Sequence, residues 1–158
     1  MNFCDVISLE NLFRAWKRFR KGKRSKKEVA EFEFNLEENL FSLCNELIIG
    51  KWKPDPYKSF YVQDPKLRKI HKASVRDRVL YQALYQALYQ VFDKTFIHDS
   101  FASRDDKGTH KGVERLEQFS RKVSRNYTQQ AFVLKCDIRK FFDSIDHQVL
   151  KSLVGKRV

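Results

Sequence analysis

Residues 132–147, FVLKCDIRKFFDSIDH, join an apolar run to a cluster of charged and aromatic residues. The run Phe132–Leu134 and the residues up to Ile138 predict a buried strand. Asp137 lies at the far end of that strand, so its carboxylate is expected to reach a cleft. A strand end that presents an acid in this way is typical of sites that transfer phosphoryl groups.

The chemistry of such a site explains the neighbouring residues. Phosphoryl transfer between nucleotides relies on positioning and on charge neutralisation by two magnesium ions. Hard cations take carboxylate and carbonyl oxygens, so Asp137 and the backbone carbonyl of Ile138 are expected to bind Mg²⁺. The flat ring of Phe142 would lie beneath an incoming sugar and leave no room for a 2′-hydroxyl. An isolated Asp is more often a solvated acid, so this prediction depends on the surrounding motif.

The stretch resembles the first catalytic motif of reverse transcriptases, particularly those of bacterial retroelements (group II introns, retrons and diversity-generating elements). Asp-Ile-x-x-Phe-Phe-x-x-Ile-x-His recurs there in nearly this form. The resemblance implies an RNA-directed DNA polymerase that uses Mg²⁺ and dNTP to extend a primer on an RNA template. It assigns Asp137 as a catalytic metal ligand, Ile138 as a carbonyl ligand, and Phe142 as the steric gate that selects dNTP.

The segment Phe60–Leu84, FYVQDPKLRKIHKASVRDRVLYQAL, resembles the fingers of the same enzymes. There, a short basic strand precedes an Asp-Arg pair that opens a long helix. The resemblance places Lys66 and Arg68 where the family binds the triphosphate of the incoming nucleotide. A guanidinium fork and a mobile ammonium both suit phosphate oxygens. Without the motif, two cations beside a proline would indicate a solvated loop.

The segment Phe96–Phe119 resembles the family's second fingers motif, which lies near the template. By this resemblance Ser100, Phe101 and Arg104 are expected close to the template backbone. Gly108 and the next two residues are expected to make a turn, with Thr109 as the N-cap of a helix. One face of that helix is apolar and carries Val113, Leu116, Phe119 and Val123. Helix punctuation alone would explain the turn equally well.

The composition points to a polyanionic partner. Lysine and arginine number 32 against 20 acids, which gives a formal charge of +12 over 158 residues. An apolar content of 42% argues against disorder. The cysteines Cys4, Cys44 and Cys136 show no paired spacing, so neither a disulfide framework nor a zinc site is predicted. Phosphate backbones are the commonest partner for such an excess of cations.

The N-terminal part is expected to be helical over residues 5–20 and again from Lys27 to Ile49, ending at Gly50. Nine of the fourteen residues from Arg14 to Lys27 are basic. The run could follow an RNA backbone, or it could be a solvated helix end and loop. The candidate RNA-binding residues are Arg14, Lys17, Arg18, Arg20, Lys21, Lys23 and Arg24.

The middle of the chain predicts short strands at 59–62 and 66–71, then a long helix from Ser74 to about Lys94. That helix contains YQALYQALYQ, in which leucines and tyrosines recur every four residues. Core packing explains this stripe better than base stacking does. The N-terminus lacks a secretory signal, and no stretch approaches the ~20 apolar residues of a membrane span. A cytoplasmic protein without membrane contact is therefore expected.

Together these signals predict an α+β fold in three parts: a basic helical extension (1–50), fingers (51–128) and the start of a palm (129–158). The family completes its metal site with a Tyr-x-Asp-Asp hairpin, which this sequence lacks. Asp143 and Asp146 are not expected to replace it, since Asp146 is predicted to cap a helix. The chain alone is expected to be inactive, and a protein supplying the rest of the palm would complement it.

Three alternatives remain open. The chain could be a retroelement-derived, maturase-like protein that binds RNA without catalysis, as the basic run suggests. It could be a helical module that enters a DNA groove, although no compact recognition helix is evident. Within the polymerase family, these motifs do not separate RNA-templated synthesis from template-independent extension of DNA.

Overall fold

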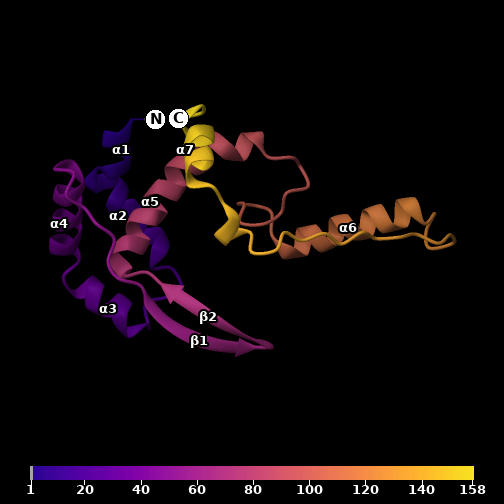
Figure 1. Ribbon diagram of the computed structural model, residues 1–158, viewed down its shortest axis with the longest axis horizontal. Helices are drawn as coiled ribbons and strands as arrows, with labels where there is room; N and C mark the ends of the chain where they lie inside the picture. Colours follow the sequence, from indigo (N-terminus) through magenta and orange to yellow (C-terminus); the bar gives the residue numbers. More distant parts are fainter. Residues whose placement is uncertain (1) are drawn as a thin grey trace. The chain divides into compact units, whose positions relative to one another are not determined.

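The computed structural model describes residues 2–158 and combines helices with a two-stranded antiparallel sheet (Figure 1). This confirms the mixed α and β class. The elements are α1 (Phe3–Ile7), α2 (Leu9–Phe19), α3 (Lys27–Phe34), α4 (Leu36–Ile48), β1 (Lys58–Asp64), β2 (Lys66–Lys72), α5 (Val75–Phe92), η1 (Asp93–Thr95), α6 (Thr109–Val123), η2 (Phe142–Ser144) and α7 (His147–Gly155). The chain divides into a first unit that ends at Gln90 and a second unit, Val91–Val158.

The first unit is built on one apolar core. Its largest fully buried side chain is Trp16, which is 1% exposed and lies 5.2 Å from Phe32 between ring centroids. The other buried members come from α2, α3, α4 and α5: Leu12, Ala15, Phe19, Val29, Leu40, Leu43, Cys44, Val75, Val79, Leu80 and Ala83. Burial of this apolar surface is the main force that assembles the four helices.

Two helices that the sequence predicts as continuous are interrupted. The helix expected over residues 5–20 breaks at Ser8, whose hydroxyl accepts a hydrogen bond from the backbone N–H of Asn11 at 3.3 Å and so caps α2. The helix expected from Lys27 to Ile49 breaks at Asn35. The Ser8 side chain competes for backbone hydrogen bonds, which explains the first break. At Asn35 the backbone leaves the helical region, with φ −113° and ψ 41°, and the side chain makes no capping hydrogen bond. Gly50 follows α4 with φ +66°, a conformation suited to glycine.

The hairpin of β1 and β2 confirms both predicted strands. It turns at Pro65, with Val62 opposite Arg68 and Asp64 opposite Lys66. Most residues of both strands are exposed on either face. The hairpin therefore extends from the first unit instead of forming part of its core.

The predicted long helix is also present, as α5. The leucines of this helix belong to the core only in its first turns, because Leu80 is buried whereas Leu84 is 44% exposed. Tyr85 and Tyr89 lie beside each other with ring centroids 5.4 Å apart. The prediction of core packing is thus confirmed for the first turns of α5.

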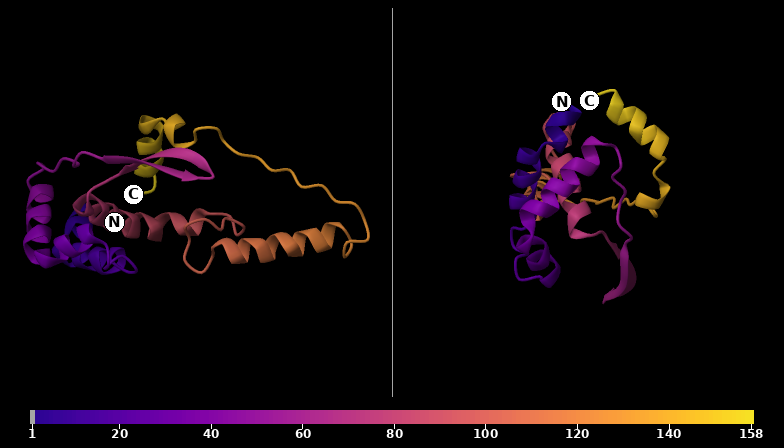
Figure 2. Two further views of the ribbon diagram at one scale, coloured as in Figure 1. Left: turned by 90° about the horizontal axis from the view of Figure 1, so that it is seen from below. Right: turned by 90° about the vertical axis from the view of Figure 1, so that its left-hand side faces the viewer.

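In the second unit, none of the described apolar side chains is fully buried. The predicted buried strand at 132–138 is wrong: these residues are exposed and have no regular secondary structure (Figure 2). A strand requires hydrogen bonds to a neighbouring strand, and no described segment pairs with this one. Thr109 is not an N-cap either, because Gly108 occupies that position with φ +106° and Thr109 is the first helical residue.

Among residues 2–158, no helix combines the length and apolarity needed to cross a membrane.

We predict that Leu40→Ala destabilises the first unit by about 2–5 kcal/mol, because it empties a fully buried core position. Urea unfolding monitored by far-UV circular dichroism measures the change. Phe34→Ala, at a residue that is 88% exposed, is the matched control and is expected to change stability little. Equal losses in the two variants would contradict the assignment of the core.

Candidate nucleic-acid interface

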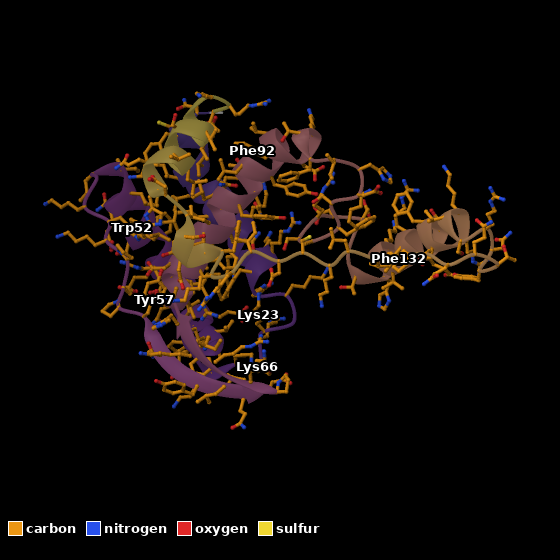
Figure 3. The ribbon with its side chains drawn as sticks, turned by 45° about the vertical axis from the view of Figure 1, so that its right-hand side comes forward. Lys23, Trp52, Tyr57, Lys66, Phe92 and Phe132 are labelled. Atoms are coloured by element: carbon orange, nitrogen blue, oxygen red, sulfur yellow. The ribbon has the colours of Figure 1, made fainter. Side chains whose placement is uncertain are left out.

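The hairpin presents its two candidate triphosphate ligands on one face. Residues two apart on a strand point the same way, so Lys66 and Arg68 share a face. Val62 is the cross-strand neighbour of Arg68 and is 39% exposed. Figure 3 shows Lys66 near the end of the hairpin, away from Tyr57 at its base. Both cations are exposed, so their charge is accessible to a polyphosphate.

The opposite face of the hairpin carries polar and aromatic groups that sequence reasoning did not single out. Tyr61 is 65% exposed and pairs across the strands with Lys69. The Ser59 hydroxyl lies 2.8 Å from Nδ1 of His71. The alternation of residues along the strands was the signal that could have identified this face.

The seven candidate cations of the N-terminal run differ in what they contact. Arg14 pairs with Glu10 at 2.7 Å, and both Arg20 and Arg24 pair with Glu33. The Lys23 ammonium donates to the carbonyl of Phe19 at 2.9 Å. Arg14 therefore pairs within α2, whereas Arg20, Lys23 and Arg24 stabilise the turn between α2 and α3. The side chains of Lys17 and Arg18, on α2, and of Lys21, in the turn, are all exposed.

Arg104 closes the loop between η1 and α6. Its side chain is only 11% exposed, and its Nε donates to Oδ1 of Asp93 at 2.7 Å. Its other nitrogens donate to the carbonyls of Ile97 at 3.0 Å, Ser100 at 3.2 Å and Asp93 at 3.3 Å. The structure therefore gives Arg104 an internal role, and its contact with a template stays a prediction.

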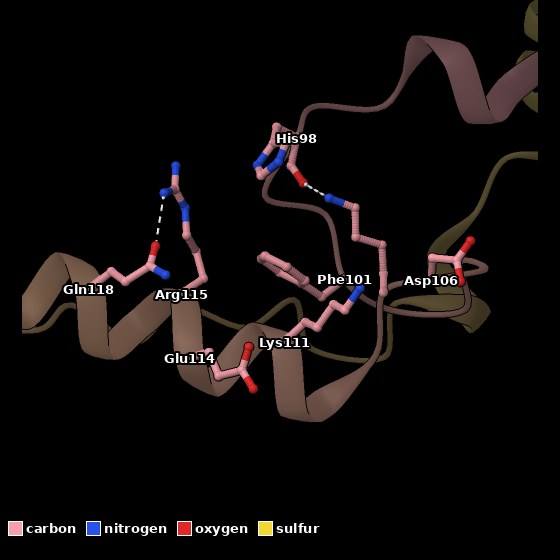
Figure 4. Close-up of a pocket in the computed structure, with 8 residues that line it drawn as sticks. His98, Phe101, Asp106, Lys111, Glu114, Arg115 and Gln118 are labelled. Carbon is pink, nitrogen blue, oxygen red and sulfur yellow. Dashed lines mark hydrogen bonds between the residues drawn. The ribbon is translucent and has the colours of Figure 1, made fainter.

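A shallow pocket of about 250 Å³ lies between this loop and α6 (Figure 4). Its lining residues are His98, Phe101, Asp106, Lys107, Lys111, Glu114, Arg115 and Gln118. Of the three residues that the sequence placed near the template, only Phe101 lines it. The sequence analysis did not identify the cations of this pocket. The spacing of Lys111 and Arg115 by four residues was an available signal, because it predicts that they share a helix face.

The pocket is mixed in charge and held together by internal contacts. Lys107 donates to the carbonyl of His98 at 3.0 Å and lies 5.3 Å from the ring centroid of Phe101. Arg115 donates to Asp99 at 2.8 Å. Hydrogen bonds from Arg115 and then from His98 lower the pKa of the Asp99 carboxyl. The cations of this pocket are thus partly neutralised by the protein itself.

Asp137 and its neighbours lie on the exposed segment that precedes η2. The Asp137 carboxylate accepts the backbone N–H of Ile138 at 2.9 Å. Phe142 is 82% exposed and lies edge-on to Phe141, with ring centroids 5.3 Å apart. The three residues assigned to metal and sugar are therefore close in the chain and accessible, but no described element covers them.

The donor set at Asp137 fits Mg²⁺ in kind but supplies only part of a coordination shell. A carboxylate and the Ile138 carbonyl are oxygen ligands of the type that Mg²⁺ prefers. Across residues 2–158, no group of three or more His, Cys, Asp or Glu side chains is placed to hold a metal ion. Water, substrate phosphates or further carboxylates would have to complete such a shell.

Asp146 is a helix cap, as the sequence predicts. One of its carboxylate oxygens accepts the backbone N–H of Gln148 at 2.7 Å and that of Val149 at 3.0 Å. These hydrogen bonds, first from Val149 and then from Gln148, lower the pKa of Asp146. Asp146 is therefore used at the start of α7.

Charged residues at the start of α5 contact the base of the hairpin, and sequence reasoning assigned them no role. Asp77 is fully buried, and its carboxylate accepts the backbone N–H of Asp55 at 2.7 Å. Nearby, burial and then a hydrogen bond with Tyr57 raise the pKa of Tyr81 to about 12. The available signal was the Asp-Arg pair itself, because acids this close to a helix start often act as caps or buried acceptors.

Glu28 on α3 joins two cations from different elements. It pairs with Lys72 of β2 at 2.7 Å and with Arg78 of α5 at 2.7 Å. Partial burial alone would raise the pKa of Glu28, but the hydrogen bonds from Lys72 and Arg78 outweigh burial and lower it. The carboxylate thus favours the folded state when it is ionised.

Comparison with known proteins gives a distant relative. No protein-family model matches the chain. Over 118 residues, or 73% of the chain, it is 24% identical to protein YkfC of Escherichia coli (strain K12). The aligned region spans 30% of the length of YkfC. The chain is therefore similar to a section of a considerably longer protein.

We predict that Glu28→Gln reduces the loss of stability in acid. The pKa of Glu28 is lowered in the folded state from its ordinary value of 4.5. Its contribution is therefore present above pH 4.5 and is lost as the pH falls through the lower folded-state pKa, because the unfolded chain then binds more protons.

The test compares the free energies of unfolding of the wild type and the variant from about pH 6 to about pH 3. The wild-type curve should fall more steeply below pH 4.5 than the Glu28→Gln curve. Glu38→Gln, which removes an exposed carboxylate of α4, controls for the change in net charge. Parallel curves for the wild type and Glu28→Gln would overturn the assignment.

Proposed function

We propose that this chain contributes the fingers and the first catalytic motif of an RNA-directed DNA polymerase of the bacterial retroelement type. The observation that carries the proposal is the exposed antiparallel hairpin with Lys66 and Arg68 on one face. The cationic hairpin precedes the Asp137 motif in the chain. This is the sequence order expected of the triphosphate-binding and metal-binding groups in such an enzyme. The resemblance of residues 132–147 to the first catalytic motif of reverse transcriptases supports the same assignment.

In this proposal the residues of the chain have separate tasks. Lys66 and Arg68 bind the triphosphate of a dNTP through charge-assisted hydrogen bonds. Phe142 lies against the sugar and disfavours a 2′-hydroxyl. Asp137 and the carbonyl of Ile138 would hold Mg²⁺, which supplies charge neutralisation at the phosphates when bound. The nucleic acid that these groups serve is a primer paired with an RNA template.

The second unit needs a further protein surface to become a polymerase site. Phe132, Val133 and Leu134 are 86%, 75% and 87% exposed, and their backbone groups have no strand partner among the described residues. Apolar surface of this kind is normally buried against other protein. We propose that a palm, in the same or another polypeptide, covers this segment and supplies the remaining carboxylates.

An RNA-binding protein without catalytic activity is the second candidate. The observation that favours it is the set of exposed cations on α2 and the following turn, with a formal chain charge of +12. Such cations bind phosphate backbones without regard to sequence and with strong salt dependence. This function requires neither Mg²⁺ nor dNTP.

We predict that Arg68→Ala weakens dNTP binding by roughly ten- to a hundredfold, since it removes a charge-assisted contact with the triphosphate. Lys69→Ala is the matched control, because Lys69 is adjacent in sequence but lies on the other face of β2. Fluorescence anisotropy with a labelled dNTP in the presence of Mg²⁺ measures both affinities. Equal losses at the two positions would show that general charge, and not this face, attracts the nucleotide.

We also predict that the purified chain binds an RNA template with an annealed DNA primer but does not extend the primer. The measurement pairs anisotropy of the labelled duplex with a gel assay for extension. If the polymerase proposal holds, Mg²⁺ and the matching dNTP should tighten the complex. A tight complex that is indifferent to both would favour the RNA-binding candidate, and extension by the chain alone would contradict the expected inactivity.

A further inference from the structure

The hairpin of β1 and β2 is exposed on both faces, so burial of its side chains does not set its direction. The two chain segments at its base are the places where its direction is determined. Both segments contact charged side chains, and three of those side chains are consecutive residues at the start of α5: Arg76, Asp77 and Arg78.

The segment that enters β1 is bound by Arg76 and Asp77. Arg76 donates to the carbonyl of Lys53 at 2.7 Å and pairs with the Asp55 carboxylate at 3.3 Å. The Asp77 carboxylate accepts the backbone N–H of Asp55 at 2.7 Å. A second guanidinium nitrogen of Arg76 contacts Glu46 of α4 at 2.8 Å. Arg76 thus ties the entry of the hairpin to α4 as well as to α5.

The segment that leaves β2 is bound through Arg78. The Glu28 carboxylate pairs with Lys72, the last residue of β2, and with Arg78, each at 2.7 Å. Arg78 also donates to the carbonyl of Ser74 at 3.2 Å, and its guanidinium lies 5.2 Å from the ring centroid of Phe19. The exit of the hairpin is therefore tied to α3 and to the core helix α2.

These contacts are partly shielded from solvent. The side chains of Arg76 and Arg78 are each 23% exposed, and Asp77 is fully buried. Water and salt screen such pairs less than they screen pairs on an open surface. Removing one partner would also leave a buried charge or backbone group without a hydrogen bond, which is costly.

We propose that Arg76, Asp77 and Arg78 are positioning residues that fix the direction of the β1–β2 hairpin relative to the helices of the first unit. Arg76 and Asp77 bind Lys53 and Asp55 ahead of the hairpin. After the hairpin, Arg78 binds the Ser74 carbonyl and reaches Lys72 through the Glu28 carboxylate, which pairs with both cations. The positioning residues hold Lys66 and Arg68 in place without touching the nucleotide. This consequence for nucleotide binding rests on the proposed function, whereas the positioning itself does not.

The positioning is tested by the distance between two spin labels on the full chain. Gln63, near the end of the hairpin, and Asn45, on α4, are both exposed and are replaced by labelled cysteines. The native thiols of Cys4, Cys44 and Cys136 are first replaced by serine. The double variant Arg76→Met, Arg78→Met keeps the apolar stems and removes both guanidinium groups. We expect a clearly broader distance distribution in the variant than in the parent.

Two further variants keep the test decisive. Arg121→Met removes an arginine that pairs with Glu117 within α6 and should leave the distribution unchanged. Glu28→Gln weakens only the exit contact and should broaden the distribution even if the double variant fails to fold. An unchanged distribution in a folded double variant, or in Glu28→Gln, would overturn the proposal.

Anisotropy with a labelled dNTP separates this inference from the proposed function. The folded double variant should bind dNTP about tenfold more weakly than the parent, because the cations are no longer held in place. If the parent itself does not bind dNTP, the proposed function fails while the spin-label distances still decide the positioning. A broader distribution with unchanged dNTP affinity would overturn the link between positioning and nucleotide binding.

Discussion

Burial of α2 against α3, α4 and α5, with Trp16 as the largest fully buried side chain, is the constraint on which the rest of the first unit depends. The exposed cations of this unit lie mainly on the outside of α2, on the turn that follows it, and on the hairpin. The core therefore supports the charged surface of α2, the turn and the hairpin.

The contacts at the base of the hairpin solve a problem that this arrangement creates. A two-stranded hairpin is at best marginally stable by itself, because it lacks a buried face. Here the core holds α5, and Arg76 and Asp77 in the first turn of α5 bind the entry of the hairpin. Arg78 acts on the exit through the Glu28 carboxylate, which pairs with both Arg78 and Lys72. Charge pairs at this position specify direction better than apolar contacts would, since hydrogen bonds depend on angle as well as distance.

The second unit has the opposite character. Its loop is held by Arg104 and its last helix by the Asp146 cap, yet none of its described apolar side chains is fully buried. Local hydrogen bonds are enough to define a turn or a helix start. They are not enough to bury Phe132, Val133 and Leu134, which are the residues that the motif places next to Asp137. Any chemistry at Asp137 therefore depends on a surface that packs against this segment.

Local patterns in the sequence were sufficient for the elements whose causes are local. The hairpin strands, α5, the glycine after α4 and the Asp146 cap follow from alternation, helical periodicity and capping, which involve residues close in the chain. The breaks at Ser8 and Asn35 were missed because periodicity continues through them. The prediction of a strand at 132–138 was wrong because a strand exists only with a hydrogen-bonded partner, and pairing is a property of the tertiary structure. Only the tertiary structure decided that Asp77 is buried and that Arg76 and Arg78 reach residues 53 and 28, since these contacts join segments distant in sequence. It also decided that Arg104 turns inward, because the path of the loop between η1 and α6 brings its partners together.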